Sequence, residues 1–249
     1  MEGDFISFQN LFFFIEARKL KPNTYLPFLV VVVIMRKKNI PNLQFVTTAS
    51  RDEIPAWEQA EEACKGGAIW ISLRTNYISY KELLPIAEKT QDICKKYNAK
   101  FIVNSNIILA KYLKADGIHL NSSDSPVDQA RLFLGKDVII GKSTNNFDET
   151  RLAYGMGADY VALGPTRFNH NQGLTKPLVT VSQFVGIKKR CQSEMIDIPI
   201  IARGGLNAED FELFMELGLD GVAITYNSGT PISTKARTES LLEKLSHFN

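Results

Sequence analysis

Side chains suited to binding an anion follow several short apolar runs of this sequence. Arg74 follows one run, and the pair Gly204-Gly205 follows another. The residues at the ends of these runs are rich in Arg, Lys, Asn, Ser and Gly, and they include one acid, Asp124. A guanidinium suits two-point contact with a phosphate, and glycine leaves backbone N–H groups open to one. We therefore expect an anion-binding site and not the paired carboxylates of a hydrolase.

An alternating pattern of strands and helices, which begins near residue 43, must position these residues. Short runs rich in Val and Ile have the length and apolar content of buried strands. The expected strands are 43–48, 68–73, 100–104, 117–120, 138–141, 160–163, 199–202 and 221–225. Between them lie segments whose apolar residues have helical spacing. The expected helices are 56–65, 81–97, 106–113, 126–134, 147–156, 180–192, 208–217 and 235–246.

This pattern predicts an α/β fold of the (β/α)8 TIM-barrel type, because strands that are apolar on both faces belong to parallel sheets. The sequences A-D-G, G-A-D and G-x-D-G precede the fourth, sixth and eighth expected strands, which indicates a repeated loop. An open doubly wound sheet is the alternative, but residues 48–53 lack the glycine-rich first turn that it usually has. In a barrel, reactive groups lie at the carboxyl ends of the strands, and Gly204-Gly205 then has the position of a common phosphate site.

The composition is that of a folded protein and gives no sign of a nucleic-acid partner. The chain has 249 residues, of which 45% are hydrophobic and 22% are charged. Its 29 basic and 27 acidic residues leave a net charge of +2, which is too balanced to indicate nucleic acid or an anionic membrane surface. Three widely spaced cysteines suggest neither a disulfide framework nor a zinc site, which favours a reducing cytoplasm. The oligomeric state, a homo-oligomer included, stays open.

Residues 1–41 are interpreted as an extension that is not part of the barrel, and residues 42–249 as the barrel domain. Two apolar runs in the extension, FISFQNLFFFI and LPFLVVVVIM, are far shorter than the roughly 20 residues of a membrane span. The acidic start and the missing small-residue cleavage site argue against a signal peptide. The start codon stays open between Met1 and Met35, and the second would leave the preceding segment outside the folded unit.

The motif ADGIHL followed by Asp124-Ser125-Pro126 is one of several that occur together in this chain. The others are IIGKST, GADYVALGP, IPIIARGGL and GLDGVAIT. Together they resemble the superfamily of thiamine phosphate synthase and thiazole tautomerase, over residues 43 to 228. The G-P-x-R-F form at Gly164–Phe168 is similar to a subgroup of the synthases.

The resemblance implies a transferase of thiamine biosynthesis that joins an aminopyrimidine methyl pyrophosphate to a thiazole phosphate. Pyrophosphate would leave with the help of Mg²⁺ and basic side chains, and the thiazole nitrogen would capture the benzylic-type cation. Catalysis of this kind depends on positioning and on neutralising the charge of the leaving group. The implied roles are pyrophosphate contact by Arg74, Asn104 and Ser143, Mg²⁺ ligation by Asp124, and thiazole phosphate binding by Gly204, Gly205 and the backbone of Ile224 and Thr225.

Three positions depart from the charges that the family pattern has. The Lys of Q-x-R-x-K is Asn76, one of two Mg²⁺ carboxylates is Ser105, and the Lys after G-P-x-R-F is Gln172. A missing carboxylate weakens a Mg²⁺ site, and missing ammonium groups weaken the stabilisation of a leaving pyrophosphate. The candidates to replace the ammonium groups are Lys176, which is assigned to substrate phosphate binding, and Lys142 and Arg203.

These departures leave three functional hypotheses open. The chain is a synthase that retains the transferase reaction, a non-catalytic binder of a thiamine-pathway phosphate, or a tautomerase-like or other phosphate-binding barrel enzyme. The tautomerase branch has a His two residues after the Ser at 143, where this chain has Asn145. His119 lies within an expected strand, so we expect it to be a buried histidine with satisfied hydrogen bonds.

Overall fold

The computed structural model describes residues 11–15, 32–36, 38–49, 54–74, 78–167, 176–206, 208–225 and 233–246. The chain divides into two compact units, Met1–Asn39 and Ile40–Asn249. Among the described residues, no helix combines the length and the apolar character that crossing a membrane requires.

The first unit contains an antiparallel pair of strands, β1 (Leu11–Ile15) and β2 (Val32–Arg36). Leu11 is paired with Arg36 and Ile15 with Val32. The sequence analysis assigned no secondary structure to this extension. The β-branched residues of β2 favour a strand, and pairing with β1 satisfies one edge of its backbone.

The second unit is a closed barrel of eight parallel strands, which confirms the predicted (β/α)8 fold. Each strand pairs with the next in the chain, and β10 pairs with β3 to close the ring. The strands are β3 (Leu43–Thr48), β4 (Trp70–Arg74), β5 (Lys100–Asn104), β6 (Gly117–Leu120), β7 (Ile139–Thr144), β8 (Tyr160–Leu163), β9 (Ile200–Arg203) and β10 (Gly221–Thr225). The expected end of β7 at residue 141 was wrong, because the polar residues up to Thr144 also pair with β8.

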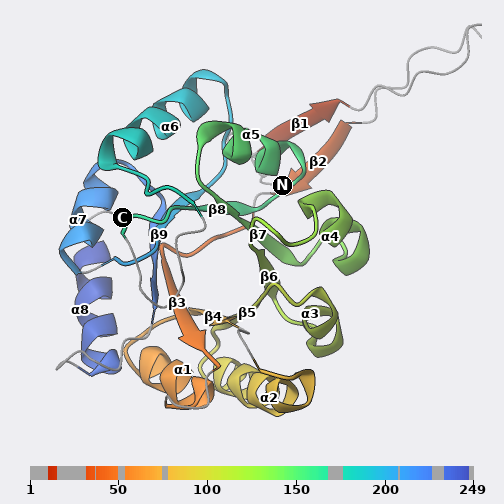
Figure 1. The fold of residues 1–249 in the computed structure, drawn as a ribbon, viewed down its shortest axis with the longest axis vertical. Helices are drawn as coiled ribbons and strands as arrows, with labels where there is room; N and C mark the ends of the chain where they lie inside the picture. Colours follow the sequence, from red (N-terminus) through yellow and green to blue (C-terminus); the bar gives the residue numbers. More distant parts are fainter. Residues whose placement is uncertain are drawn as a thin grey trace, which may run out of the picture. The chain divides into compact units, whose positions relative to one another are not determined.

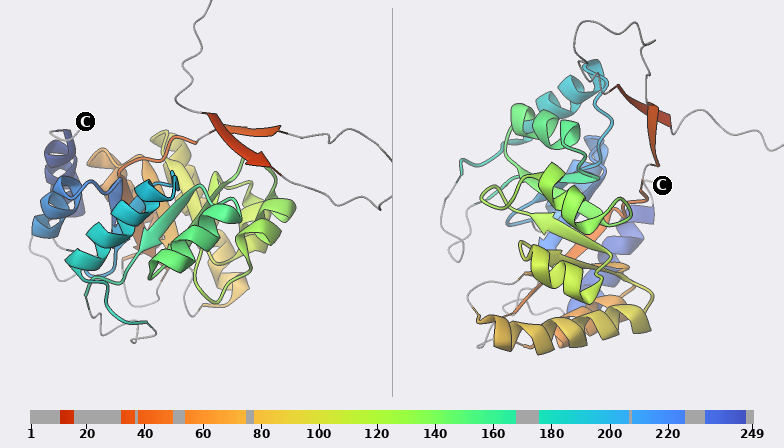
Figure 2. Two further views of the ribbon diagram at one scale, coloured as in Figure 1. Left: turned by 90° about the horizontal axis from the view of Figure 1, so that it is seen from above. Right: turned by 90° about the vertical axis from the view of Figure 1, so that its right-hand side faces the viewer.

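Eight helices surround the barrel (Figure 1), and the side views also place them outside the strands (Figure 2). Their bounds differ from the expected ones by one residue at most. Some of the one-residue differences arise because a side-chain cap sets where the helix starts. Ser79 and Thr180 each form a capping box with the residue three positions later. The helices are α1 (Ala56–Lys65), α2 (Tyr80–Lys96), α3 (Ile107–Leu113), α4 (Val127–Leu134), α5 (Phe147–Gly155), α6 (Val181–Ser193), α7 (Ala208–Glu216) and α8 (Thr234–Ser246).

Successive side chains along each strand point to opposite faces of the sheet and so form two apolar layers. The larger layer lies between strands and helices and includes Phe101, Ile118 and Phe184. The smaller layer, which includes Trp70 and Tyr160, comes from the alternate strand residues and fills the barrel interior. Because the interior layer fills the barrel, polar side chains that face inward near the carboxyl ends of the strands are positioned at its mouth.

The repeated loop of the sequence analysis has one structural role. An aspartate ahead of each of the strands β6, β8 and β10 accepts a hydrogen bond from a backbone N–H near the start of the preceding strand. The contacts join Asp116 to Phe101 N (2.8 Å), Asp159 to Ile140 N (2.7 Å) and Asp220 to Ile200 N (2.8 Å). These contacts fix pairs of adjacent strands at the end of the barrel opposite the candidate site.

Candidate active site

Three of the expected site residues face the barrel interior at one end of the sheet. Arg74 ends β4, Asn104 ends β5, and Ser143 lies one residue before the end of β7. Because all strands are parallel, these ends lie at the same mouth of the barrel. Trp70 and Ile102 belong to the interior layer, and Arg74 and Asn104 share their alternation on the same strands.

A second guanidinium, Arg203, lies at this mouth. Arg203 ends β9, and its Nε donates to the carbonyl oxygen of Ala162 at 3.2 Å. Burial, followed by repulsion from Arg74, lowers the pKa of Arg203 to about 10. The side chain therefore stays cationic at neutral pH, and two neighbouring guanidiniums make the mouth attractive to an anion.

A hydrogen-bonded chain crosses the barrel interior and ends on Ser143. Gln44 Nε2 donates to the hydroxyl of Tyr160 at 3.0 Å, and that hydroxyl lies 3.0 Å from His119 Nδ1. His119 Nε2 lies 2.9 Å from Ser143 Oγ. Because the amide nitrogen of Gln44 can only donate, the Tyr160 hydrogen is best directed to Nδ1, and Nε2–H then donates to Ser143.

His119 is neutral in this chain. Burial, with added repulsion from Arg203, Lys142 and Arg74, lowers its pKa to about 3. Both ring nitrogens have partners, which confirms the prediction of a buried, satisfied histidine. Ser143 Oγ accepts from this ring, and its own hydrogen is directed to Asn121 Oδ1 at 3.4 Å, a long contact that an anion at the mouth can replace.

Asn121 links four groups of the mouth and was missed as a site residue. Its N–H donates to Asp124 Oδ2 at 2.6 Å, and its side chain donates to Ser105 Oγ at 2.7 Å. Its carbonyl accepts from Lys142 Nζ at 2.6 Å, and its Oδ1 lies 3.4 Å from Ser143 Oγ. The position directly after β6 was the available signal, but the partners come from other strands.

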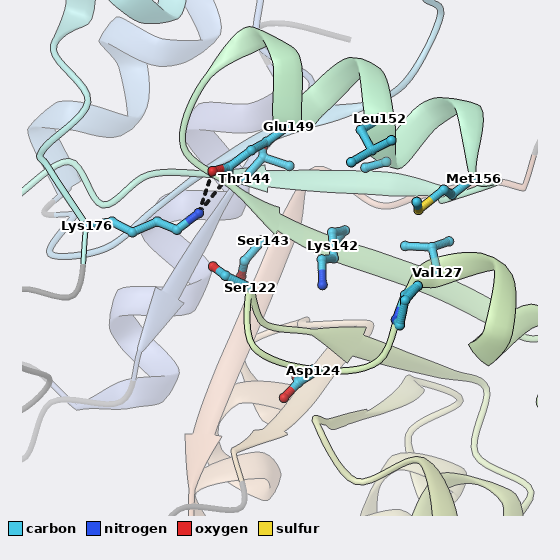
Figure 3. A pocket seen from close by; sticks show the side chains of 12 residues that line it. Ser122, Asp124, Val127, Lys142, Ser143, Thr144, Glu149, Leu152, Met156 and Lys176 are labelled. Carbon is cyan, nitrogen blue, oxygen red and sulfur yellow. Dashed lines mark hydrogen bonds and ion pairs between the residues drawn. The ribbon is translucent and has the colours of Figure 1, made fainter.

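A pocket of about 280 Å³ opens between the loop after β6, the end of β7 and α5 (Figure 3). Asp124, Lys142, Ser143 and Lys176 give it a charged and polar side, and Lys142 points from β7 toward the loop that carries Asp124. Its remaining lining residues are Ser122, Pro126, Val127, Thr144, Glu149, Leu152, Ala153 and Met156.

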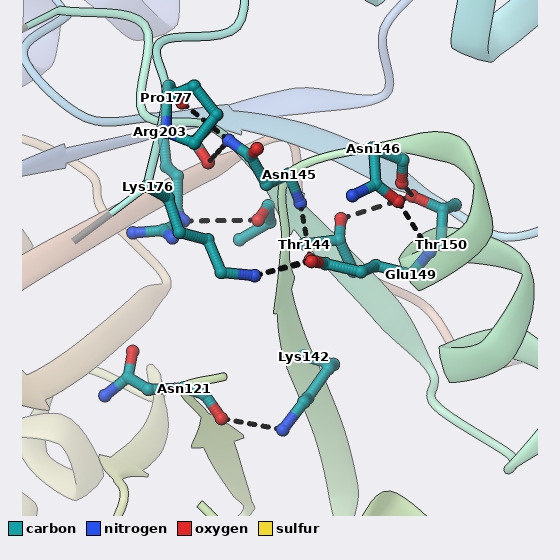
Figure 4. Close-up of polar contacts among 12 residues, drawn as sticks. Asn121, Lys142, Thr144, Asn145, Asn146, Glu149, Thr150, Lys176, Pro177 and Arg203 are labelled. Atoms are coloured by element: carbon teal, nitrogen blue, oxygen red, sulfur yellow. Dashed lines mark hydrogen bonds and ion pairs between the residues drawn. The ribbon is translucent and has the colours of Figure 1, made fainter. Parts of the chain in front are cut away.

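Lys176 belongs to this pocket and forms an ion pair within it. Its Nζ lies 2.6 and 2.8 Å from the two carboxylate oxygens of Glu149 in the first turn of α5 (Figure 4). Nearby, Asn145 donates its side-chain N–H groups to the carbonyl oxygens of Gly164 and Pro177, at 3.1 and 2.8 Å. Asn145 thus fixes two loops together at the position where the tautomerase branch has its histidine.

Gly204 and Gly205 follow β9 at the same mouth and have φ angles of +92° and +73°. A Cβ at Gly204 would lie 2.8 Å from Pro165 Cβ, so only glycine fits under the loop after β8. Within the described residues, no acceptor takes a hydrogen bond from the N–H of either glycine. These N–H groups, followed by α7, make a backbone site of the kind that binds phosphate.

The neighbouring strand β10 supplies the other two expected phosphate-binding residues. Ile224 is buried in the layer under the helices, which leaves its backbone as the part that can contact a ligand. Thr225 ends β10 and is only partly buried. Asn76 and Gln172, which carry two of the charge departures, lie outside the described residues.

Of the two carboxylates that line the pocket, Glu149 is paired with Lys176, which leaves Asp124 as the candidate to bind a cation. The described residues contain no cluster of three or more His, Cys, Asp or Glu side chains able to hold a metal by themselves. Asp124 is joined through Asn121 to Ser105, which offers a hydroxyl oxygen. Mg²⁺ is commonly held by one or two carboxylates together with substrate phosphate oxygens and water, so this donor set fits a Mg²⁺ that binds with a pyrophosphate.

Comparison with known proteins gives consistent matches over the barrel. The family model described as "Thiamine monophosphate synthase" matches residues 43–227. The thiamine-phosphate synthase of Phocaeicola vulgatus is 36% identical over 193 residues, covering 78% of this chain and 91% of that protein. That of Clostridium novyi is 37% identical over 167 residues, covering 67% and 79%. The thiamine phosphate pyrophosphorylase of Pyrococcus furiosus superposes with a TM-score of 0.71 at 26% identity, covering 83% and 96%.

Proposed function

Because the chain belongs to the thiamine monophosphate synthase family, we propose that it is a thiamine-phosphate synthase. It is a transferase that joins an aminopyrimidine methyl pyrophosphate to a thiazole phosphate and releases pyrophosphate. The bond between the methylene carbon and the pyrophosphate oxygen breaks, and its electron pair stays on the oxygen. The thiazole nitrogen then forms the new bond to the methylene carbon.

Arg74, Asn104 and Ser143 bind the pyrophosphate group of the first substrate. The Arg74 guanidinium supplies charge and two-point contact, and the Asn104 amide supplies further donors. Ser143 donates its hydroxyl hydrogen to the substrate in place of the 3.4 Å contact with Asn121 Oδ1. These groups stabilise the negative charge that grows on the leaving group, which is the main demand of this reaction.

The thiazole phosphate binds at Gly204 and Gly205, with the backbone of Ile224 and Thr225 on the adjacent strand. The backbone N–H groups of Gly204 and Gly205, a few residues ahead of α7, suit a phosphate dianion. Arg203 directly precedes the glycines and lies near Arg74, so cationic side chains border both anion positions.

Asp124 and the hydroxyl of Ser105 would hold a Mg²⁺ together with pyrophosphate oxygens. Bound there, the ion supplies neutralisation of the charge on the leaving pyrophosphate. The protein's own contribution is to hold Asp124 in place, which it does through the 2.6 Å hydrogen bond from Asn121 N.

One observation supports this proposal: Arg74, Ser143, Asp124 and the glycine pair all lie at or just after the carboxyl ends of parallel strands in a barrel of this family. Incubation with both substrates and Mg²⁺ should release pyrophosphate and form thiamine phosphate. Folded protein that gives no turnover, but whose melting temperature rises with thiazole phosphate, would support the non-catalytic binder instead.

A further inference from the structure

Lys142 places a charged side chain on the outward-facing side of β7, where part of its surroundings is apolar. It lies between Gly141 and Ser143, and strand alternation directs its side chain away from the barrel axis. The pocket residues on that side include Val127, Leu152 and Met156, which are apolar. Burial lowers the pKa of Lys142, so placing an ammonium here opposes folding.

The end of the Lys142 side chain returns to the charged side of the same pocket. Its Nζ donates to the carbonyl of Asn121 at 2.6 Å, on the loop that carries Asp124 (Figure 4). The neighbouring residue Ser143 lines the same pocket. The ammonium is thus positioned on the same side of the pocket as Asp124 and Ser143, which border the expected pyrophosphate.

The two pocket lysines differ in how their charge is compensated. Both oxygens of Glu149 contact Lys176. Among the described residues, no carboxylate oxygen lies within the 4.0 Å ion-pair distance of Lys142 Nζ. An ammonium has three donor hydrogens, and the Asn121 carbonyl takes one of them. Asp124 and Glu149 attract the ammonium without an ion pair to it among the described residues. Lys142 therefore keeps donor hydrogens for an anionic ligand in the pocket.

We propose that Lys142 is a further catalytic residue of this site, whose ammonium binds the pyrophosphate group beside Ser143 and stabilises it as it leaves. This inference rests on the proposed function and adds a residue to it. Lys142 stays protonated throughout and neutralises the oxygen that receives the electron pair of the broken bond. It supplies a positive charge in a chain that has Asn76 and Gln172 at two positions where the resemblance implies lysine.

The test compares three variants with the wild type. Lys142→Met removes the ammonium and keeps an apolar stem, and Lys142→Arg keeps a cation. Lys136→Met is the matched control, because Lys136 is exposed and precedes the opposite end of β7. Calorimetry with inorganic pyrophosphate and Mg²⁺ measures binding, and pyrophosphate release measures turnover.

We expect Lys142→Met to weaken pyrophosphate binding at least ~10-fold and to lower kcat on the order of 100-fold, as for the loss of one electrostatic contact to a transition state. KM for thiazole phosphate should change less than about twofold, and Lys142→Arg should recover most of the binding. Binding and turnover of Lys142→Met that match Lys136→Met would overturn the inference.

Failure of the proposed function has a different signature. A wild type that releases no pyrophosphate, but binds it in a Lys142-dependent manner, refutes the synthase and supports the Lys142 contact. A wild type that binds no pyrophosphate refutes the Lys142 contact. Should Lys142→Met not fold, Lys142→Gln gives the same comparison, because its amide stays polar without a charge.

Discussion

Ser105 occupies the position where a second carboxylate for Mg²⁺ is implied, and its backbone suits the exchange. Its φ of +62° lies in the left-handed region, which Asp tolerates better than most residues. Ser105→Asp should therefore fold normally and lower the Mg²⁺ concentration for half-maximal pyrophosphate release about tenfold, since a second carboxylate strengthens a Mg²⁺ site. A Mg²⁺ titration of the rate checks this.

Ser105→Asn is the control for this exchange. Asparagine shares the backbone preference and size of aspartate and lacks the charge. The prediction is wrong if both variants shift the Mg²⁺ dependence equally, because the gain would then come from the backbone and not from a ligand.

His119 makes the free energy of unfolding depend on pH. Its pKa is about 3 in the folded chain and about 6.5 when unfolded, so the unfolded state binds the additional proton between these values. The free energy of unfolding should thus be unaffected by this group above pH 6.5. It should fall as the pH drops toward 3, by up to about 1.4 kcal/mol per pH unit.

Other groups also titrate in this range, so the measurement is a comparison. Urea unfolding of the wild type and of His119→Gln between pH 3.5 and about 7.5 gives, for each protein, the slope of the unfolding free energy against pH. The wild-type slope should exceed that of the variant by close to one proton. Equal slopes would mean that His119 is protonated at the same pH in both states.

At the scale of elements, the aspartates Asp159 and Asp116, which precede β8 and β6, differ in the partners that they hold. Asp159 is paired with Arg131 at 2.6 Å, with side-chain exposures of only 12% and 14%. Asp159→Ala should lower the free energy of unfolding by roughly 3–5 kcal/mol, because it removes the carboxylate that pairs with the largely buried guanidinium of Arg131. Asp116→Ala removes the same kind of backbone contact without a described ion pair and should cost about 1–3 kcal/mol.

Denaturant unfolding of both variants measures this difference. Asp159→Asn is an informative intermediate, because its side-chain oxygen can still accept from Ile140 N–H while the charge is lost. Equal costs for Asp159→Ala and Asp116→Ala would show that the backbone contact, and not the ion pair, dominates.

At the scale of the whole molecule, the barrel closes without the first unit. The β10–β3 pairs that complete the ring run from Val222 with Leu43 to Thr225 with Val46. A chain that begins at Met35 should therefore keep the melting temperature within a few degrees and the rate of pyrophosphate release within about twofold. Thermal unfolding and the release assay test this, and a loss of either would show that the barrel depends on residues 1–34.

The sequence alone determined the order and kind of the barrel elements. The helical spacing of apolar residues is local, so it predicted the eight helices to within one residue. The capping box at Ser79 is local too, but it became evident only in the structure. The mouth was predictable too, because the carboxyl ends of parallel strands meet whatever their detailed register. Arg74, Asp124 and Gly204-Gly205 were therefore expected at one end before any contact was known.

Only the tertiary structure decided which partners these residues have. The chain from Gln44 through Tyr160 and His119 to Ser143 joins four strands, and its register depends on how the barrel closes. The Lys176–Glu149 pair and the Asn121 contacts likewise join segments that no local pattern relates. Periodicity tells which side of a strand a residue takes, whereas pairing between distant strands, set by barrel closure, decides what that residue meets.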